Sequence, residues 1–318
     1  MTLRILLTGK NGQVGSELAK LLPSVGELTA VGRSELDLRK PHDIRRLISE
    51  SRPNLVINAA AYTAVDLAER EESLAHVINT DAPALIAEEA KRIGATVIHY
   101  STDYVFDGWK RTPYVEGDLP HPLSAYGRSK LGGEEAIRAC GIPHLILRTA
   151  WVYATSGRNF LLTVLRLAST REELRIVNDQ FGAPTWARAI AEATARLLLG
   201  FDPSAGVLAR LGSVAGTYHL TAAGETTWYE FAVAILDEVR KSADMGSGRS
   251  LAELAWFRSA TEARPIVAKR VVPIPTRDYP TPARRPAYSV LSNARFASTF
   301  GFSLPDWRSQ LADAMAIG

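Results

Sequence analysis

The stretch LLTGKNGQVGSELAKLL, residues 6–22, joins the end of an apolar run to a glycine-rich turn and an amphipathic segment. Its glycines, Gly9, Gly12 and Gly15, follow the spacing G-x-x-G-x-x-G, one residue longer in the first gap than the dinucleotide-binding fingerprint. Glycines here permit a tight turn and let backbone N–H groups approach a pyrophosphate at a helix N-terminus. The stretch predicts a nucleotide-binding βαβ unit, with a plain strand-to-helix turn as the alternative.

The alternation of strand and helix continues to about residue 150. Apolar runs with the length of buried strands lie at 4–9, 28–32, 55–60, 96–102 and 144–149. Amphipathic segments separate them at 13–22, 43–51, 73–93 and 126–140. This pattern predicts an α/β fold, a Rossmann-type doubly wound parallel sheet. We expect residues 1–150 to form this NAD(P)-binding domain.

The remaining residues, 151–318, are expected to form mostly a smaller C-terminal α/β substrate-binding domain, with part of 173–200 returning to the first domain. The patterns predict a strand at 173–179 and helices at 186–199 and 226–241. We expect residues 242–263, with a polar start, to be a mobile surface insertion. The proline-rich stretch 273–286 is expected to be an ordered loop rather than a helix or a central strand.

The bulk composition of the 318 residues is that of an ordinary globular protein, 46% hydrophobic and 22% charged. A net charge of +3 without a block of five basic residues gives no reason to expect nucleic acid as a partner. Cys140 is the single cysteine, so no disulfide can form within the chain. Without a signal peptide or an apolar stretch long enough to span a bilayer, we expect a cytoplasmic protein with no membrane partner.

The end of the second predicted strand bears on the choice of cofactor. An acidic residue there would bind the ribose 2′-hydroxyl of NAD, but the sequence AVGRSELDL places Arg33 at this point. An arginine can pair with a 2′-phosphate, which favours NADPH, with NADH as the alternative. A solvated surface charge is the other interpretation of Arg33.

Three polar residues follow the fourth predicted strand and begin the next helix. Thr102 stands at the carboxyl edge of the sheet, and Tyr126 and Lys130 are one helical turn apart. An ammonium near a phenol lowers its pKa from about 10, so that the phenol can hand a proton to a ketone oxygen as hydride arrives. Lys130 can also hold the nicotinamide ribose, and Thr102 can orient the carbonyl. We therefore expect catalysis of ketone reduction.

The motifs TGKNGQVG, STDYVFDG and YGRSK resemble the extended short-chain dehydrogenase/reductase superfamily. NAAAYTAVDLAE (58–69), LRTAWVY (147–153), NDQFGAPT (178–185) and YPTPARRP (279–286) more specifically resemble the dTDP-4-dehydrorhamnose reductase family. The resemblance covers nearly the whole chain except 242–263. It implies reduction of the C4 ketone of dTDP-4-dehydro-β-L-rhamnose by NADPH, the last step of dTDP-L-rhamnose synthesis.

The resemblance also implies roles for individual residues. It gives Thr102, Tyr126 and Lys130 the catalytic roles described above. Residues on the cofactor side would be Gly12, Gln13 and Val14 at the pyrophosphate, Asp37 and Leu38 near the adenine, and Ala61, Tyr62, Thr63 and Tyr100 along the sheet edge. Residues on the sugar-nucleotide side would be Asp103 and Trp151, with Asn159, Gln180 and Arg285 as further candidates.

The chain departs from the family at positions that hold Mg²⁺ between subunits in some members. Glu17 matches one such glutamate, but Arg188 and Ala294 stand where those members carry glutamate. A site that keeps one carboxylate and gains an arginine should bind Mg²⁺ poorly. We expect no metal site, and a monomer or a weak homodimer that Mg²⁺ does not bridge.

Two alternatives remain open at this stage. One is another nucleotide-sugar enzyme of the same fold, an epimerase or a 4,6-dehydratase. A dehydratase needs an Asp-Glu pair after the threonine, whereas this sequence has Asp103-Tyr104. The second alternative is a non-catalytic regulatory subunit, similar to that of methionine adenosyltransferase.

Overall fold

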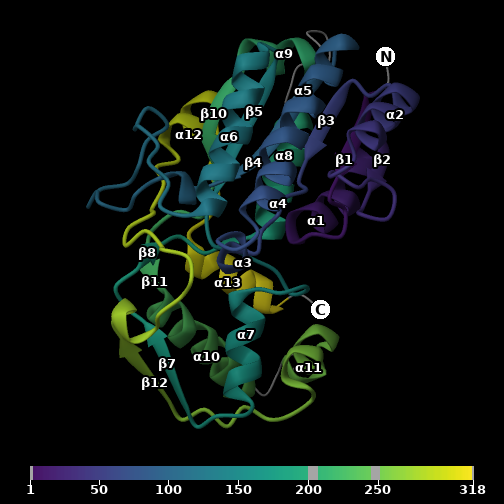
Figure 1. Ribbon diagram of the computed structural model, residues 1–318. Coiled ribbons are helices and arrows are strands. Elements are labelled where there is room, and N and C mark those ends of the chain that lie inside the picture. The colour runs from purple at the N-terminus through teal and green to yellow at the C-terminus, as the bar shows by residue number, and fades with distance from the viewer. Residues whose placement is uncertain (1–2, 200–206, 245–250, 317–318) are drawn as a thin grey trace.

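Figure 1 shows the computed structural model of the chain, which describes residues 3–199, 207–244 and 251–316. Its centre is a six-stranded parallel sheet. The strands are β1 (Arg4–Thr8), β2 (Glu27–Val31), β3 (Leu55–Asn58), β4 (Thr96–Thr102), β5 (His144–Thr149) and β10 (Gly216–His219). The five strands predicted from the first half of the sequence are confirmed, with ends that agree to within two residues.

The strand order β10-β5-β4-β3-β1-β2 places the first two crossovers on opposite sides of β1. The chain passes from β1 to β2 on one side, then crosses back to β3 on the other. A doubly wound sheet binds its ligands outside the carboxyl ends of the strands at such a reversal. The fold therefore places a binding crevice at the ends of β1 and β3.

Alternating side chains of the strands face two different layers of helices. Leu6 packs in a cluster with side chains of α2 (Pro41–Ser51), α5 (Ala82–Arg92) and α6 (Ala125–Cys140). Ile5 and Leu7 belong to a second cluster with side chains of α1 (Gln13–Leu21), α8 (Ala187–Leu199) and α9 (Val207–Ser213). Both faces of the sheet are thus covered, which confirms the doubly wound architecture (Figure 1).

The segment predicted as one helix at 73–93 is divided into α4 (Glu72–His76), a π-helical turn η2 (Val77–Asp81) and α5. Within the turn, Asn79 accepts a hydrogen bond from the Tyr62 N–H (2.8 Å) and donates one to the Tyr62 carbonyl (3.0 Å). A Cβ on Gly133 of α6 would lie 2.2 Å from the Asn79 carbonyl oxygen. The π turn therefore anchors Tyr62 and lets α6 approach closely.

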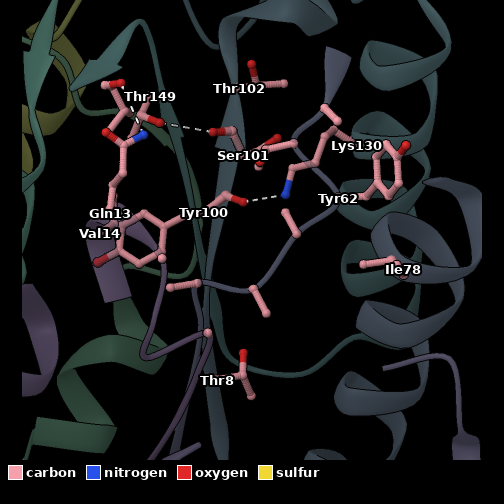
Figure 2. Close-up of a pocket in the computed structure, with 18 of the residues that line it drawn as sticks. Thr8, Gln13, Val14, Tyr62, Ile78, Tyr100, Ser101, Thr102, Lys130 and Thr149 are labelled. Atoms are coloured by element: carbon pink, nitrogen blue, oxygen red, sulfur yellow. Dashed lines mark hydrogen bonds between the residues drawn. The ribbon is translucent and has the colours of Figure 1, made fainter. Parts of the chain in front are cut away.

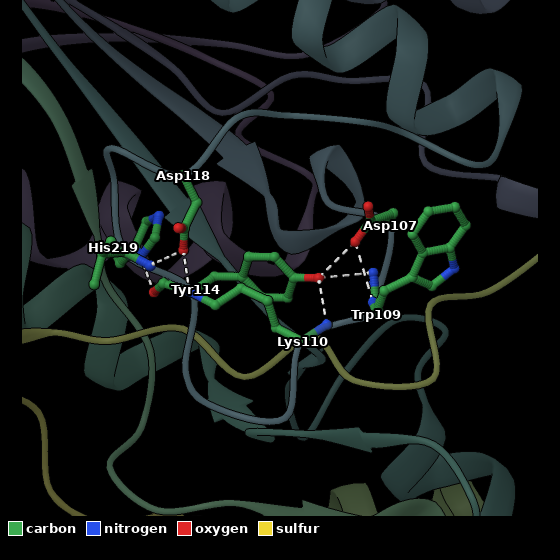
Figure 3. Close-up of polar contacts among 8 residues, drawn as sticks. Asp107, Trp109, Lys110, Tyr114, Asp118 and His219 are labelled. Atoms are coloured by element: carbon green, nitrogen blue, oxygen red, sulfur yellow. Dashed lines mark hydrogen bonds and ion pairs between the residues drawn. The ribbon is translucent and has the colours of Figure 1, made fainter.

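The loop between β4 and α6 is held by the side chain of Tyr114 (Figure 3). The Tyr114 hydroxyl donates to Asp107 (2.7 Å) and accepts from the Gly108 N–H (2.9 Å), and the Tyr114 carbonyl lies 3.1 Å from His219 Nδ1. Lys110 forms an ion pair with Asp118 at 2.6 Å. These contacts fix the loop that precedes the N-terminus of α6.

The second half of the chain builds a smaller lobe and also returns to the sheet (Figure 1). The lobe contains α7 (Phe160–Ala168), α10 (Trp228–Asp244), α11 (Ala255–Thr261), α13 (Trp307–Ala316) and a parallel pair of strands, β7 (Glu173–Val177) and β12 (Arg270–Ile274). In the other direction, α8 packs on α1, β10 pairs with β5, and α12 (Ala294–Phe300) packs on β10. Short elements complete the described part: α3 (Val65–Ala68), β6 (Val152–Tyr153), β8 (Phe181–Gly182), β9 (Thr185–Trp186), β11 (Thr226–Thr227) and the 3₁₀ turns η1 (Leu22–Ser24), η3 (Asp103–Val105), η4 (Leu251–Glu253) and η5 (Thr276–Asp278).

Two predictions for this half need correction. Within 242–263, residues 245–250 lie outside the described residues, but the rest is not a surface insertion, because α10 continues to 244 and Leu251, Leu254 and Phe257 are buried in the main core cluster. The stretch 273–286 is mostly loop, yet Pro273 belongs to β12. Both strands of a two-stranded sheet are edges, where a proline is tolerated. Among the described residues, no helix combines the length and apolarity needed to cross a membrane.

Candidate active site

A cavity of about 780 Å³ opens where β1, β3 and β4 end, at the predicted crevice (Figure 2). Residues of both halves of the chain line it. Of the residues singled out from the sequence, those that line the cavity are Gly9, Gly12, Gln13, Val14, Arg33, Asp37, Leu38, Ala61, Tyr62, Thr63, Tyr100, Thr102, Asp103, Tyr126, Lys130 and Trp151. Those that do not are Gly15, Asn159, Gln180 and Arg285.

The glycine loop forms the part of the cavity at the N-terminus of α1. Gly9 adopts a left-handed conformation (φ 78°), and a Cβ there would lie 2.7 Å from the Ala60 nitrogen. A Cβ on Gly15 would lie 2.0 Å from the Gly9 carbonyl oxygen, so Gly15 serves close packing of helix on loop. Gly12 is the N-cap of α1 and lines the cavity. The glycine loop thus forms a cradle lined by backbone atoms, and side chains at its glycine positions would fill that space.

Gln13 lies directly after this cradle, and its side chain is only partly satisfied. Its Nε2 is 3.4 Å from the Val152 carbonyl oxygen, whereas its buried Oε1 has no hydrogen-bond partner within the described chain. Buried polar atoms are normally paired, so an orphaned oxygen in a cavity points to a ligand group. The cradle and this oxygen fit a dinucleotide at the N-terminus of α1.

The turn after β2 forms one end of the cavity. Glu35 accepts a hydrogen bond from the Gly32 N–H (2.9 Å) and pairs with Lys10 (2.7 Å), which leaves the exposed Arg33 on the cavity wall. Arg39 binds both oxygens of Asp37 and holds the pKa of that carboxyl at about 2. Arg33 is therefore in place to meet a 2′-phosphate, while the Asp37 carboxylate is already engaged.

Tyr126 and Thr102 meet at the sheet edge. The side chain of Ser124 caps α6 by accepting from the Gly127 N–H (3.1 Å), which places Tyr126 in the first turn. Thr102 Oγ1 accepts from the Tyr104 N–H (3.2 Å) and is 3.1 Å from an Asp103 oxygen. Desolvation raises the pKa of Tyr126 to about 12, while a hydrogen bond with Thr102 opposes the rise. Tyr126 is thus a protonated donor at neutral pH.

Lys130 is buried, at 2% exposure, and its Nζ donates to the Tyr100 carbonyl at 2.6 Å (Figure 2). Burial lowers the pKa of Lys130 to about 8, and the charge of Glu134 opposes this. The expectation that Lys130 lowers the pKa of Tyr126 is wrong for this structure. The amine is directed at the backbone of β4, and desolvation dominates at the phenol.

Asp103 and Tyr104 follow Thr102 and line the same cavity. Burial raises the pKa of Asp103 to about 6. The Tyr104 ring meets the Tyr126 ring edge-on, with centroids 5.7 Å apart, and burial raises its pKa as well. A neutral phenol with a raised pKa is a poor base, so position 104 does not supply the second acid/base group of a dehydratase.

An aromatic wall of Trp151 and Trp228 closes the side of the cavity next to the smaller lobe. The two indoles stack 3.5 Å apart at an angle of 5°, and Trp151 adopts a left-handed backbone (φ 46°). A Cβ on Gly182 would lie 2.3 Å from the Trp151 ring. Gln180 accepts a hydrogen bond from Trp228 Nε1 (3.2 Å), so it supports the wall from outside the cavity.

The two remaining substrate candidates have structural partners. Asn159 caps α7: its oxygen accepts from the Leu162 N–H (3.2 Å), and its nitrogen donates to the Ala154 and Ser156 carbonyls. Arg285 forms a bidentate ion pair with Asp66 of α3, with one N–O distance of 2.8 Å. These contacts account for both side chains without a ligand.

Arg158 and Trp228 are among the cavity residues that were not identified from the sequence. Trp228 was assigned to a helix only, and no local pattern shows that the start of α10 reaches the cavity. Arg158 is an exposed cation in a loop without periodicity. Their placement depends on tertiary packing of the smaller lobe.

Two of the three positions compared with a Mg²⁺ site carry ion pairs, and the third is Ala294, which has no ligand atom in its side chain. Glu17 pairs with Lys20 at 2.6 Å, and Arg188 pairs with Glu192 at 2.8 Å. In residues 3–199, 207–244 and 251–316, no group of three or more His, Cys, Asp or Glu side chains could hold a metal ion.

Comparison with known proteins agrees with this geometry. Residues 3–317 match the family model described as RmlD substrate binding domain. The chain is 47% identical to the dTDP-4-dehydrorhamnose reductase of Burkholderia thailandensis (96% of each chain) and 42% identical to that of Escherichia coli (96% of this chain, 95% of the other). The crystal structure of the Bacillus anthracis dTDP-4-dehydrorhamnose reductase, in complex with NADP, superposes with a TM-score of 0.83 at 30% identity, covering 98% of each chain. The chain belongs to the dTDP-4-dehydrorhamnose reductase family.

Proposed function

We propose that this enzyme reduces the C4 ketone of dTDP-4-dehydro-β-L-rhamnose with NADPH and forms dTDP-L-rhamnose. The observation that carries the proposal is the convergence of Thr102, Tyr126 and Lys130 in one cavity with the glycine loop. Near-full-length relatives named dTDP-4-dehydrorhamnose reductase support the substrate, and the relative in complex with NADP supports the cofactor.

The residues at the cradle fit NADPH. Backbone groups of Gly12 and Gln13 and the N-terminus of α1 would hold the pyrophosphate, and Arg33 would meet the 2′-phosphate. Lys130 would hold the nicotinamide ribose. NADPH, when bound, supplies a hydride to C4 of the sugar.

The protein supplies the matching proton. Tyr126 hands its phenolic proton to the sugar O4 as the C4–O double bond becomes a single bond, so the ketone becomes a secondary alcohol. Its raised pKa keeps the proton available at neutral pH. Thr102 donates a hydrogen bond to the same oxygen and so orients it. The Tyr126 phenolate then recovers a proton from solvent, with the nearby Lys130 amine as the adjacent proton carrier.

The smaller lobe would hold the rest of the sugar nucleotide. Asp103 and Trp151 line the cavity beside the catalytic residues, and the exposed Arg158 is placed to attract a diphosphate. For Asn159, Gln180 and Arg285 we propose supporting roles, because each side chain is engaged by the protein. We further propose that the enzyme acts in the cytoplasm as a monomer or weak homodimer without a Mg²⁺ bridge, since Glu17 and Arg188 are ion-paired and the third position is Ala294.

The test is oxidation of NADPH by the purified chain with dTDP-4-dehydro-β-L-rhamnose, formed in place by an upstream epimerase. We expect consumption of NADPH, and one product that is identified as dTDP-L-rhamnose by NMR. In a parallel assay with a nucleotide sugar that still carries its C6 hydroxyl, loss of water without net NADPH consumption would indicate a dehydratase. NADPH binding without any turnover would indicate a regulatory subunit.

A further inference from the structure

Three buried polar residues form a row across the centre of the sheet. Thr8, Asn58 and His99 are register partners on β1, β3 and β4, and each is at most 1% exposed. Most of the strand residues around them are apolar, and buried polar side chains are costly unless they are hydrogen-bonded. Apolar side chains at these three positions would avoid this cost, so we expect the polar side chains to have a function that apolar ones could not perform.

The hydrogen bonds along this row determine the direction of each donor. Asn58 Oδ1 accepts from Thr8 Oγ1 (2.6 Å) and from the Ala60 N–H (3.3 Å). A backbone N–H can only donate, so the oxygen of the Asn58 amide must face it. The Asn58 nitrogen then donates to His99 Nδ1 at 3.0 Å. Burial, and next the charge of Lys130, hold the pKa of His99 well below its usual value, so the ring is neutral and carries its proton on Nε2.

The Nε2–H of His99 faces the amine of Lys130. The two nitrogens are 3.3 Å apart, and Lys130 also donates to the Tyr100 carbonyl at 2.6 Å. An N–H cannot hydrogen-bond to an ammonium, which has only donors, but it can bond to the lone pair of a neutral amine. The charged group that bears on Lys130 is Glu134 of α6, whose carboxylate pairs with Arg148 of β5, and the neutral phenol of Tyr126 shares the cavity.

We propose that His99 is a positioning residue for Lys130, with Asn58 fixing the tautomer of the imidazole: its Nε2–H docks the neutral-amine form of Lys130, the form that prevails in mildly alkaline solution, on β4 until NADPH binds. This inference rests on the proposed function, because it concerns the lysine of that same site. When the anionic cofactor enters, the amine takes a proton from solvent, leaves the imidazole and turns to the ribose hydroxyls. NADPH binding is thereby coupled to the uptake of a proton.

Proton uptake can be measured without turnover. We would titrate NADPH into the protein by calorimetry near pH 8.5, in buffers of different ionisation enthalpy. Since the pKa of Lys130 is about 8, more than half a proton should be taken up per NADPH bound. In His99→Gln, an amide oxygen can accept from the ammonium, so Lys130 is already charged and the uptake should fall by at least half. In His99→Gln, the pH at which half of the proton uptake is observed should rise by about one unit or more.

His219→Gln is the matched control. His219 is equally buried, at 0% exposure, and its ring lies against the Tyr114 carbonyl (Figure 3), which is its hydrogen-bond partner in place of Lys130. This variant should keep the wild-type proton uptake. Equal uptake in wild type and His99→Gln, or no uptake in wild type, would overturn the proposal. If NADPH binding takes up a proton but the sugar is not reduced, the proposed function is contradicted and this inference is still supported.

A second measurement needs neither a variant nor a ligand. In ¹⁵N-histidine-labelled wild-type protein, long-range ¹H–¹⁵N correlation spectra distinguish the two neutral tautomers of each of the six histidines. Two buried rings, His99 and His219, should stay neutral at low pH and exchange slowly. We expect one of them, His219, to carry its proton on Nδ1, which faces the Tyr114 carbonyl, and the other, His99, to carry it on Nε2. Protons on Nδ1 in both rings, or a charged second ring at neutral pH, would contradict the proposal.

Discussion

Replacement of Gly15 by alanine tests the packing of the glycine loop. The new Cβ would lie 2.0 Å from the Gly9 carbonyl oxygen, 2.7 Å from its carbon and 3.2 Å from the Lys10 nitrogen. All three are backbone atoms, so no side chain can rotate away, and α1 must move by more than 1 Å. Overpacking of this kind costs about 1–3 kcal/mol, and we expect the upper end.

Gly12→Ala is the matched control for this experiment. Its Cβ would lie 3.3 Å from the Gly9 oxygen, and its backbone (φ −80°, ψ 169°) suits alanine. We expect a loss of less than about 1 kcal/mol, the usual cost of an unfavourable N-cap. However, this Cβ lies in the cradle, so NADPH affinity should fall in both variants.

The assays are urea unfolding for stability and fluorescence titration for NADPH. The expected pattern is a stability loss of about 3 kcal/mol in Gly15→Ala alone, with weakened NADPH binding in both variants. If Gly15→Ala unfolds within about 0.5 kcal/mol of wild type and binds NADPH normally, the reasoning about the loop is refuted.

Three further predictions concern charge. Arg33→Ala should weaken NADPH binding by about tenfold or more and leave NADH binding unchanged, measured by titration with each cofactor; equal losses would contradict a 2′-phosphate contact. Glu134→Gln should destabilise the fold by about 3–5 kcal/mol in urea unfolding, because it leaves the buried Arg148 unpaired. Burial would raise the pKa of Glu134, but Arg148 and neighbouring donors outweigh it and hold that pKa below its usual value. The contribution of Glu134 to the free energy of unfolding is therefore present above the usual carboxyl pKa and is lost as the pH falls; a wild-type pH dependence in the variant would rule this out. Light scattering with Mg²⁺ and with EDTA should give the same mass, because Glu17 and Arg188 are ion-paired; a dimer that forms only with Mg²⁺ would contradict this.

The first half of the fold could be predicted because its signals are local. Apolar runs ending in glycine or a hydroxyl residue predict buried strands, and the spacing of Gly9, Gly12 and Gly15 predicts the turn into α1. The strand order could not be predicted, since it depends on which side each crossover packs. Residues 251–261 were misjudged because Leu251, Leu254 and Phe257 are buried by α7 and α10, whose position no local pattern reveals.

For the active site, residue types were predictable and their environments were not. Tyr126 and Lys130 share a helix face by spacing alone. The directions of their pKa shifts depend on burial. The orientation of the Lys130 amine depends on His99 and the Tyr100 carbonyl, which belong to a strand some thirty residues away in the chain. The same holds for Asn159, where a helix cap explains the side chain that resemblance assigned to substrate.

The most direct test of the central claim is the rate of hydride transfer in Tyr126→Phe. Single-turnover oxidation of bound NADPH by dTDP-4-dehydro-β-L-rhamnose should be at least about 10²-fold slower than in wild type, the usual contribution of a general acid. The dissociation constant for NADPH should change little, since only the hydroxyl is removed. A rate within about tenfold of wild type would contradict the assignment of Tyr126 as the proton donor.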